Sequence, residues 1–127
     1  MRAVDTNVLV RLMTRDDPRQ VAVAEAFVAG GAWVPYLAIA EASWVLESVY
    51  ECEAAAIATA VEMLLNHEQL SVQDAEVVEA ALAKYRHHPR VGFSDCLMLE
   101  VARKAGHIPL GTFDRALGNI DGAHRLS

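Results

Sequence analysis

The sequence predicts an α/β domain with a short parallel sheet of four or five strands and helices on both of its faces. Short apolar runs, too brief for helices, alternate with longer segments in which apolar residues recur at helical spacing. Gly, Pro and helix-starting Asp residues separate these segments. Strands that are separated by helical segments are typical of parallel sheets, because a parallel crossover is usually a helix.

The N-terminal half is expected to hold two strands, Ala3–Val4 and Ala32–Val34, and three helices. The first helix follows Asn7 and continues to Met13. The second begins at the N-cap Asp17 and at Pro18, and the glycines at 30 and 31 end it. The third runs from about Leu37 to Tyr50, and its expected inward stripe is Leu37, Ala40, Trp44, Val45 and Ser48.

The C-terminal half is expected to hold the remaining strands and helices. A short helical turn through Leu117 should follow the fourth strand, and the pair His87 and His88 is interpreted as a solvated helix end rather than a metal site. The expected helices are 53–66, 74–87 and 92–106, and the expected strands are Gln69–Val72, Ile108–Thr112 and an edge strand, Ala123–Leu126.

The length and composition predict one domain, residues 1–127, with a well-filled core and some apolar surface for a partner. No apolar run approaches the roughly 20 residues that span a bilayer. Asp5 and Arg11 interrupt the N-terminal apolar stretch, which makes it a poor signal peptide. Cys52 and Cys96 are expected in helices as reduced thiols, which favours a cytoplasmic protein without a membrane anchor.

The formal charge of -6 argues against a protein that binds nucleic acid tightly without help. Setting aside four carboxylates as metal ligands leaves a charge of -2, which is nearly neutral. A bound divalent cation would make the region around them more positive. The acidity is therefore compatible with a metal-dependent nuclease.

Four acidic residues interrupt apolar surroundings and stand apart from the other acids. Asp5 and Asp114 follow predicted strands, and Asp95 opens a predicted helix. Glu41 lies within the apolar stripe of the third helix, where a carboxylate is costly to bury without compensation. In a parallel α/β sheet these places lie near one edge, where ligands bind. The alternative remains open that the four acids only cap helices and face water.

Such a cluster would need a cation. Two carboxylates about 5 Å apart repel by roughly 3 kcal/mol at an effective dielectric of about 20. A hard divalent cation removes this penalty, and Mg²⁺, or alternatively Mn²⁺, suits an all-carboxylate site better than zinc. The ion can deprotonate a water and stabilise the charge on a phosphodiester during hydrolysis.

Four motifs resemble those of the PIN-domain ribonucleases, and within them the VapC-type toxins of toxin–antitoxin pairs. They are V-D-T-N-V-L-V-R from Val4, A-E-A-S-W-V-L from Ala40, F-S-D-C-L-M from Phe93 and G-T-F-D-R-A-L from Gly111. The resemblance covers essentially the whole chain, in order. One mild departure is Ser94, where many relatives have a small apolar residue. The resemblance implies a PIN-like three-layer sandwich, a homodimer and metal-dependent RNA cleavage.

The resemblance also implies roles for individual residues. Asp5, Glu41, Asp95 and Asp114 match the metal-binding and catalytic acids. Thr112 and Thr6 match polar residues that assist them, and Asn7 lies next to this group. The family implies a cognate antitoxin in a hydrophobic groove. Candidate groove or core residues are Leu9, Leu12, Met13, Trp44 and Val45, and the arginines that could contact RNA phosphates or only solvent are Arg11, Arg15, Arg86 and Arg90.

The leading hypothesis is a Mg²⁺-dependent endoribonuclease that acts as the toxin of such a pair. The alternative is a PIN-like module that no longer cleaves and acts through a protein partner. A phosphoacceptor domain would need a second acid beside Asp5, where Thr6 stands, and a haloacid dehalogenase would need an aspartate in place of Asn7. The sequence does not match either of these two classes.

Overall fold

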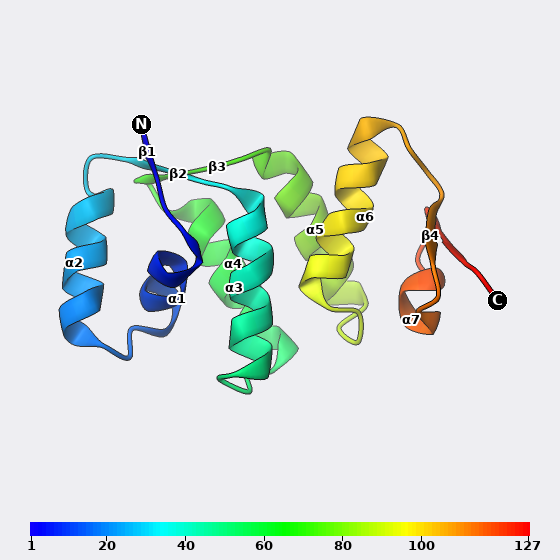
Figure 1. Cartoon of the computed structure of the whole chain (residues 1–127), viewed down its shortest axis with the longest axis horizontal. Helices are drawn as coiled ribbons and strands as arrows, with labels where there is room; N and C mark the ends of the chain where they lie inside the picture. The colour runs from blue at the N-terminus through cyan, green and yellow to red at the C-terminus, as the bar shows by residue number, and fades with distance from the viewer.

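The computed structural model describes residues 1–127 as seven helices and five short strands (Figure 1). The strands are β1 (Arg2–Ala3), β2 (Ala32–Val34), β3 (Leu70–Val72), β4 (Leu110–Thr112) and β5 (Ala123–Arg125). The helices are α1 (Thr6–Thr14), α2 (Pro18–Val28), α3 (Tyr36–Ser48), α4 (Ala54–Asn66), α5 (Ala75–His87), α6 (Phe93–Ala105) and α7 (Arg115–Gly118). The predicted α/β class is confirmed, and a strand forms at each predicted place.

The five strands divide into two parallel sheets instead of the single sheet expected from the sequence. β1, β2 and β3 pair in that order, with Arg2 opposite Ala32 and Ala32 opposite Leu70. β4 pairs with β5 alone, with Leu110 opposite Ala123. In Figure 1, β1 lies in the left part of the view and β4 at the right, with α6 between them. The carboxyl ends of β1 and β4 are therefore not neighbours within one chain.

The three-stranded sheet is not covered evenly on its two faces. Ala32 and Val34 of β2 are fully buried, whereas Trp33 between them remains 39% exposed. Successive side chains of a strand point to opposite faces. The cover of helices that the sequence predicts on both faces is thus incomplete at Trp33.

One hydrophobic core joins the helices and strands. Phe93 of α6 is fully buried and packs edge-on against Tyr85 of α5, with ring centroids 5.8 Å apart. Leu117 and Ile120, near the C-terminus, belong to the same buried cluster. The core therefore holds the C-terminal strands to the molecule even though they lie far from the main sheet.

Most helix ends follow the local signals of the sequence. Asp17 caps α2 by accepting from the backbone N–H of Gln20 at 3.1 Å, and Pro18 begins that helix. Gly106 ends α6 in the left-handed conformation, with φ of 83°, which favours glycine. These boundaries are confirmed because they depend on neighbouring residues alone.

The prediction for the buried face of α3 is wrong. Its buried residues are Ala38, Ile39, Ala42, Ser43 and Leu46. Leu37 and Trp44, which were expected inside, are 65% and 61% exposed. The helix is apolar nearly all round, so its periodicity does not distinguish one face from the other. Glu41 consequently lies on an exposed surface rather than on the buried side.

The two cysteines are free thiols, as predicted. Cys96 lies in α6, and burial raises the pKa of its thiol to about 12. Cys52 lies in the loop between α3 and α4 rather than in a helix, which corrects the sequence-based expectation. None of the seven helices has the length and apolar character that crossing a membrane requires.

We expect Leu99→Ala to lower the free energy of unfolding by about 2–5 kcal/mol, because it leaves a cavity in a fully buried site. Leu37→Ala, on the exposed face of α3, should change it by less than about 0.5 kcal/mol. Urea denaturation of both variants measures the difference. Equal losses at the two positions would contradict the burial described above.

Candidate carboxylate site

Asp5 links β1 to α1 and has two roles to fill. Its Oδ1 accepts a hydrogen bond from the backbone N–H of Val8 at 3.1 Å and so caps α1. The helix-cap role that the sequence left open is therefore real. The cap uses one oxygen, and no hydrogen bond in the structure occupies Oδ2. Asp5 can cap the helix and still present an oxygen to a ligand.

Glu41 lies beside the start of α1. The hydroxyl of Thr6 donates to Glu41 Oε1 at 3.2 Å and so joins α1 to α3. This contact forms because α1 packs against α3. Thr6 therefore positions Glu41, on a surface that also carries the exposed Trp44. Asp5 and Glu41 form the first pair of candidate ligands, bridged through Thr6.

Asp95 and Asp114 form a second pair. Asp95 lies half-buried in the first turn of α6, where burial and then the charge of Asp114 raise the pKa of its carboxyl. Asp114 follows β4 and caps α7, with Oδ2 accepting from the Leu117 N–H at 2.7 Å. The N–H of Asp114 donates to Thr112 Oγ1 at 3.0 Å. Thr112 thus fixes the backbone that carries Asp114.

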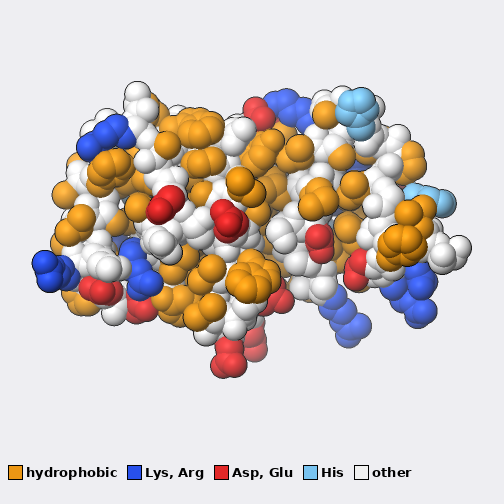
Figure 2. Space-filling view, viewed as in Figure 1, with side chains coloured by type: hydrophobic (Ala, Val, Ile, Leu, Met, Phe, Trp, Pro, Cys, Tyr) orange, Lys and Arg blue, Asp and Glu red, His pale blue; other side chains and the backbone are white.

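The structure brings the four acids together only as these two pairs. No group of three or more His, Cys, Asp or Glu residues lies close enough to hold a metal ion. Figure 2 shows carboxylates scattered singly among hydrophobic side chains on this face. The single pocket expected from the sequence does not form within one chain, because β4 does not lie beside β1. The oxygen donors suit Mg²⁺ chemically, but their placement in one chain does not fit one ion.

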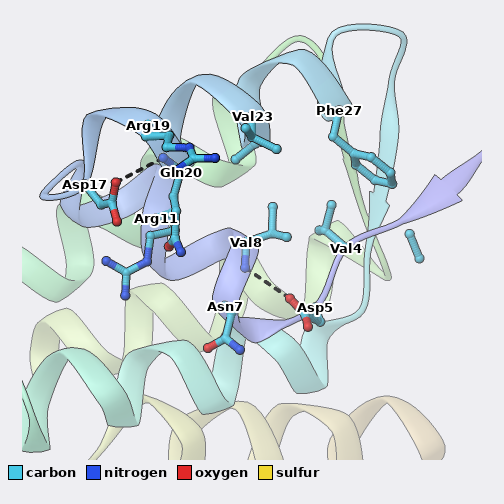
Figure 3. Close-up of a pocket in the computed structure, with 12 residues that line it drawn as sticks. Val4, Asp5, Asn7, Val8, Arg11, Asp17, Arg19, Gln20, Val23 and Phe27 are labelled. Atoms are coloured by element: carbon cyan, nitrogen blue, oxygen red, sulfur yellow. Dashed lines mark hydrogen bonds between the residues drawn. The ribbon is translucent and has the colours of Figure 1, made fainter.

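A pocket of about 840 Å³ opens beside Asp5, between β1, α1 and α2 (Figure 3). Val8, Val23 and Phe27 give it an apolar wall. Its polar residues include Arg19, which makes no ion pair, and Asn7. Sequence reasoning missed this pocket because it assigned Phe27 to the core stripe of α2. The ring of Phe27 is instead covered by the Arg2 guanidinium, 3.8 Å from its centroid.

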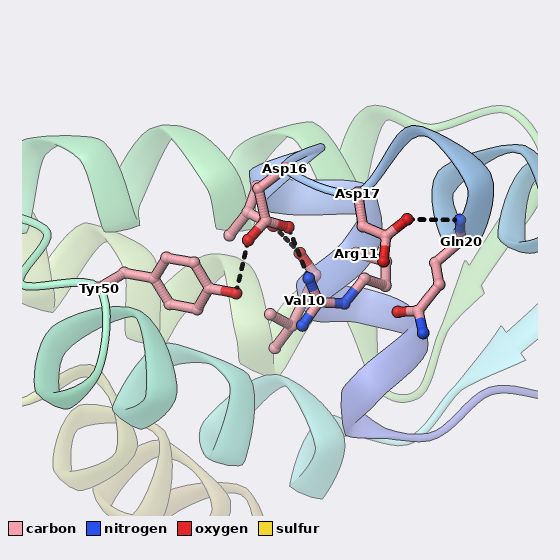
Figure 4. Close-up of polar contacts among 7 residues, drawn as sticks. Val10, Arg11, Asp16, Asp17, Gln20 and Tyr50 are labelled. Carbon is pink, nitrogen blue, oxygen red and sulfur yellow. Dashed lines mark hydrogen bonds and ion pairs between the residues drawn. The ribbon is translucent and has the colours of Figure 1, made fainter.

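Arg11 is committed to a hydrogen-bonded group at the end of α1 (Figure 4). It forms an ion pair with Asp16, which also accepts from Thr14 at 2.8 Å and from the Tyr50 hydroxyl at 3.0 Å. The hydrogen bond from Thr14, followed by that from Tyr50 and the charge of Arg11, lowers the pKa of Asp16. Arg11 is thus a weaker candidate for RNA phosphates than the sequence suggests.

The other arginines that the sequence offers for phosphate contacts differ in the same respect. Arg15 pairs with Glu25 at 3.3 Å, and Arg86 pairs with Glu62 at 3.2 Å. Arg90 makes no salt bridge and is exposed. It is therefore the one member of this group that is free to bind an anion without breaking an existing pair.

The family model described as PIN domain matches residues 2–123. The chain belongs to the PIN domain family. Proteins of this family are generally nucleases that use divalent metal ions, and they commonly bind RNA. Neither the comparison with curated proteins nor that with solved structures gives a match.

The coupling of Asp95 to Asp114 in this PIN domain is testable by titration. We expect Asp114→Asn to lower the pKa of Asp95 toward its ordinary value of 3.8, but not all the way, because burial is the larger cause. Asparagine can still cap α7. NMR titration of the metal-free protein measures the shift. An unchanged pKa would show that the two carboxyls are not neighbours.

Stability should depend on pH through the same group. A carboxyl whose pKa is raised on folding binds its proton more tightly in the native state, so acidification stabilises that state. The free energy of unfolding of the wild type, relative to that of Asp95→Asn, should rise as the pH falls from the native pKa to 3.8. Urea denaturation of both proteins in metal-free buffer at several pH values measures this difference. A difference that is independent of pH would be evidence against the raised pKa.

Proposed function

We propose that this PIN domain protein is a Mg²⁺-dependent endoribonuclease and acts as the VapC-type toxin of a toxin–antitoxin pair. One observation carries the proposal: both outer pairs of elements end in a carboxylate with an oxygen that can face a ligand. Asp5 follows β1, and Asp114 follows β4. Membership of the PIN domain family supports the nuclease part of the proposal.

The residues would divide the work as follows. Asp5, Glu41, Asp95 and Asp114 are the proposed metal ligands and catalytic acids. Thr112 would fix the loop that carries Asp114, as its hydrogen bond at 3.0 Å indicates. A divalent cation, Mg²⁺ or alternatively Mn²⁺, would supply the positive charge that makes water more acidic and stabilises the phosphodiester. The free Arg90 is a candidate for contact with RNA phosphate.

The proposed partners are RNA, a cognate antitoxin and a second copy of the chain, in the cytoplasm. Support for a protein partner comes from α3, where Leu37 and Trp44 expose large apolar side chains near Glu41. Large apolar groups gathered on a surface commonly mark a binding site. Leu9 and Leu12, which the sequence offered as groove residues, are buried in the core instead. Met13 and Val45 are partly buried against it.

A second candidate function is a PIN-like module that binds a partner without cleaving RNA. The separation of the carboxylates into two pairs favours it, because one chain does not gather three ligands. RNA cleavage that requires a metal ion would exclude this candidate.

We expect Asp5→Asn and Glu41→Gln each to lower RNA cleavage by about 100-fold or more. Mutation of even the outer neighbours of metal ligands costs about 10–100-fold. The matched control is Glu47→Gln, on the same helix as Glu41 and also exposed, which should retain activity. Cleavage of a labelled RNA, with and without EDTA and added Mg²⁺, measures the effect. Full activity of Asp5→Asn in Mg²⁺ would refute the assignment.

The toxin role requires growth inhibition that depends on the same acids. Induced expression of the wild type in a bacterial host should slow growth and reduce intact RNA, whereas Asp5→Asn should do neither. Asparagine preserves the cap on α1, so loss of the effect would report on the charge and not on folding. Equal toxicity of both proteins would contradict the proposed role.

A further inference from the structure

Two strands have an edge without a partner. β1 pairs only with β2, and β4 pairs only with β5. Arg2 and Ala3 of β1, and Gly111 of β4, are exposed. The free edge of a strand presents backbone donors and acceptors that can pair with another strand. The sequence, moreover, predicts one parallel sheet from all five strands.

The same chain cannot join these two edges without losing buried contacts. The C-terminal unit, defined as residues 110–125, is anchored on α6 by its buried Leu117 and Ile120. Arg103 of α6 donates to the Asp121 carbonyl at 2.7 Å and pairs with the buried Glu100. Moving the C-terminal unit to β1 of its own chain would break these interactions. Docking on a second chain leaves them intact.

The separation of the edges suits a closed pair of copies. β1 and β4 lie in different halves of the molecule along its longest axis (Figure 1). Two copies side by side, with their axes in opposite directions, can place each β4 against the β1 of the other. This arrangement is a closed two-fold dimer with two equivalent contacts.

We propose that the C-terminal unit of each copy docks through β4 on β1 of a second copy, and that each carboxylate site is shared between the copies. Asp5 and Glu41 would come from one protomer, and Asp114, with Asp95, from its partner. The carboxyl ends of parallel strands meet at one edge of a sheet, which would place Asp114 beside Asp5. The shared site rests on the proposed function, whereas the docking of the strands does not.

Charge and apolar surface both favour this contact. Residues 1–85 contain thirteen acids and five Lys or Arg, a net charge of -8, whereas residues 86–127 contain four acids and six Lys or Arg, a net charge of +2. Docking therefore brings opposite charges together. The C-terminal unit exposes Phe113 by 75%, and Trp33 is exposed beside β1. Burial of such side chains would supply the stability that strands of two or three residues do not.

Mixing of inactive variants tests the shared site. Asp5→Asn and Asp114→Asn should each be inactive alone. After joint unfolding and refolding in equal amounts, about half of the dimers are mixed, and each mixed dimer has one intact site. We expect the mixture to recover about a quarter of the activity of wild type treated in the same way.

The matched control is a mixture of Asp5→Asn with Glu41→Gln. Both substitutions lie on the same side of the shared site, so every site of a mixed dimer lacks one acid. This mixture should remain inactive. Recovery in neither mixture, with an active wild type, would overturn the shared site. Recovery in both would overturn it as well.

A disulfide experiment tests the docking without reference to activity. Ala3→Cys and Gly111→Cys, in chains with tags of different length, should form an oxidised heterodimer on a non-reducing gel. A Cβ at Gly111 would make only an ordinary contact of 3.5 Å with Leu126. The control pairs Gly111→Cys with Gly30→Cys, where an added Cβ meets nothing within 4 Å. The control and the oxidised wild type should give no heterodimer.

The double variant with Ala3→Cys and Gly111→Cys in one chain decides between the two ways of joining the edges. We expect disulfide-linked dimers. A disulfide-linked monomer would show that β4 docks on β1 of its own chain and would overturn the proposal. If the heterodimer forms but the wild type does not cleave RNA, the docking stands and the proposed function fails.

Discussion

The packing of α6 determines where the carboxylates of this PIN domain lie. One side of the helix joins the hydrophobic core through Phe93, Cys96 and Leu99. Its C-terminal part holds residues 110–125 through Arg103 and the buried Glu100. Because both attachments involve buried groups, α6 fixes Asp114 at a distance from Asp5. The division of the strands into two sheets follows from this one helix.

Electrostatic repulsion makes the separation favourable for an isolated chain. Asp95 already shows the effect of one neighbouring carboxylate, because Asp114 adds to the burial that raises its pKa. A third and a fourth carboxylate would raise such pKa values further and weaken the fold locally. Assembly of all four acids therefore needs a compensating charge, and the chain can keep two pairs apart until that charge is present.

The sequence predicted best what depends on neighbouring residues. The strand positions, the cap at Asp17 and the end of α6 at Gly106 all follow from local signals. The buried face of α3 could not be predicted, because Leu37 and Trp44 on one side are as apolar as Ile39 and Leu46 on the other. The pairing of β4 with β5 alone is a non-local outcome of packing, and no local pattern encodes it.

The carboxylates were easier to find than their arrangement. Asp5 and Asp114 stand where an apolar run ends, which is a signal in the sequence itself. The contact between Thr6 and Glu41 needs α1 to pack on α3, and the pocket beside Asp5 needs α2 to cross β1. Such features join segments that are distant in the sequence, so only the folded chain reveals them.

The hydrogen bonds from Val8 to Asp5 and from Leu117 to Asp114 have a consequence for ligand capture. Each bond restricts its carboxylate to one rotamer before any ligand arrives. The loss of side-chain entropy is then part of folding and does not recur at association. A ligand that meets these two oxygens would encounter preorganised groups, and its affinity would suffer less from their immobilisation than at a pair of freely rotating surface aspartates.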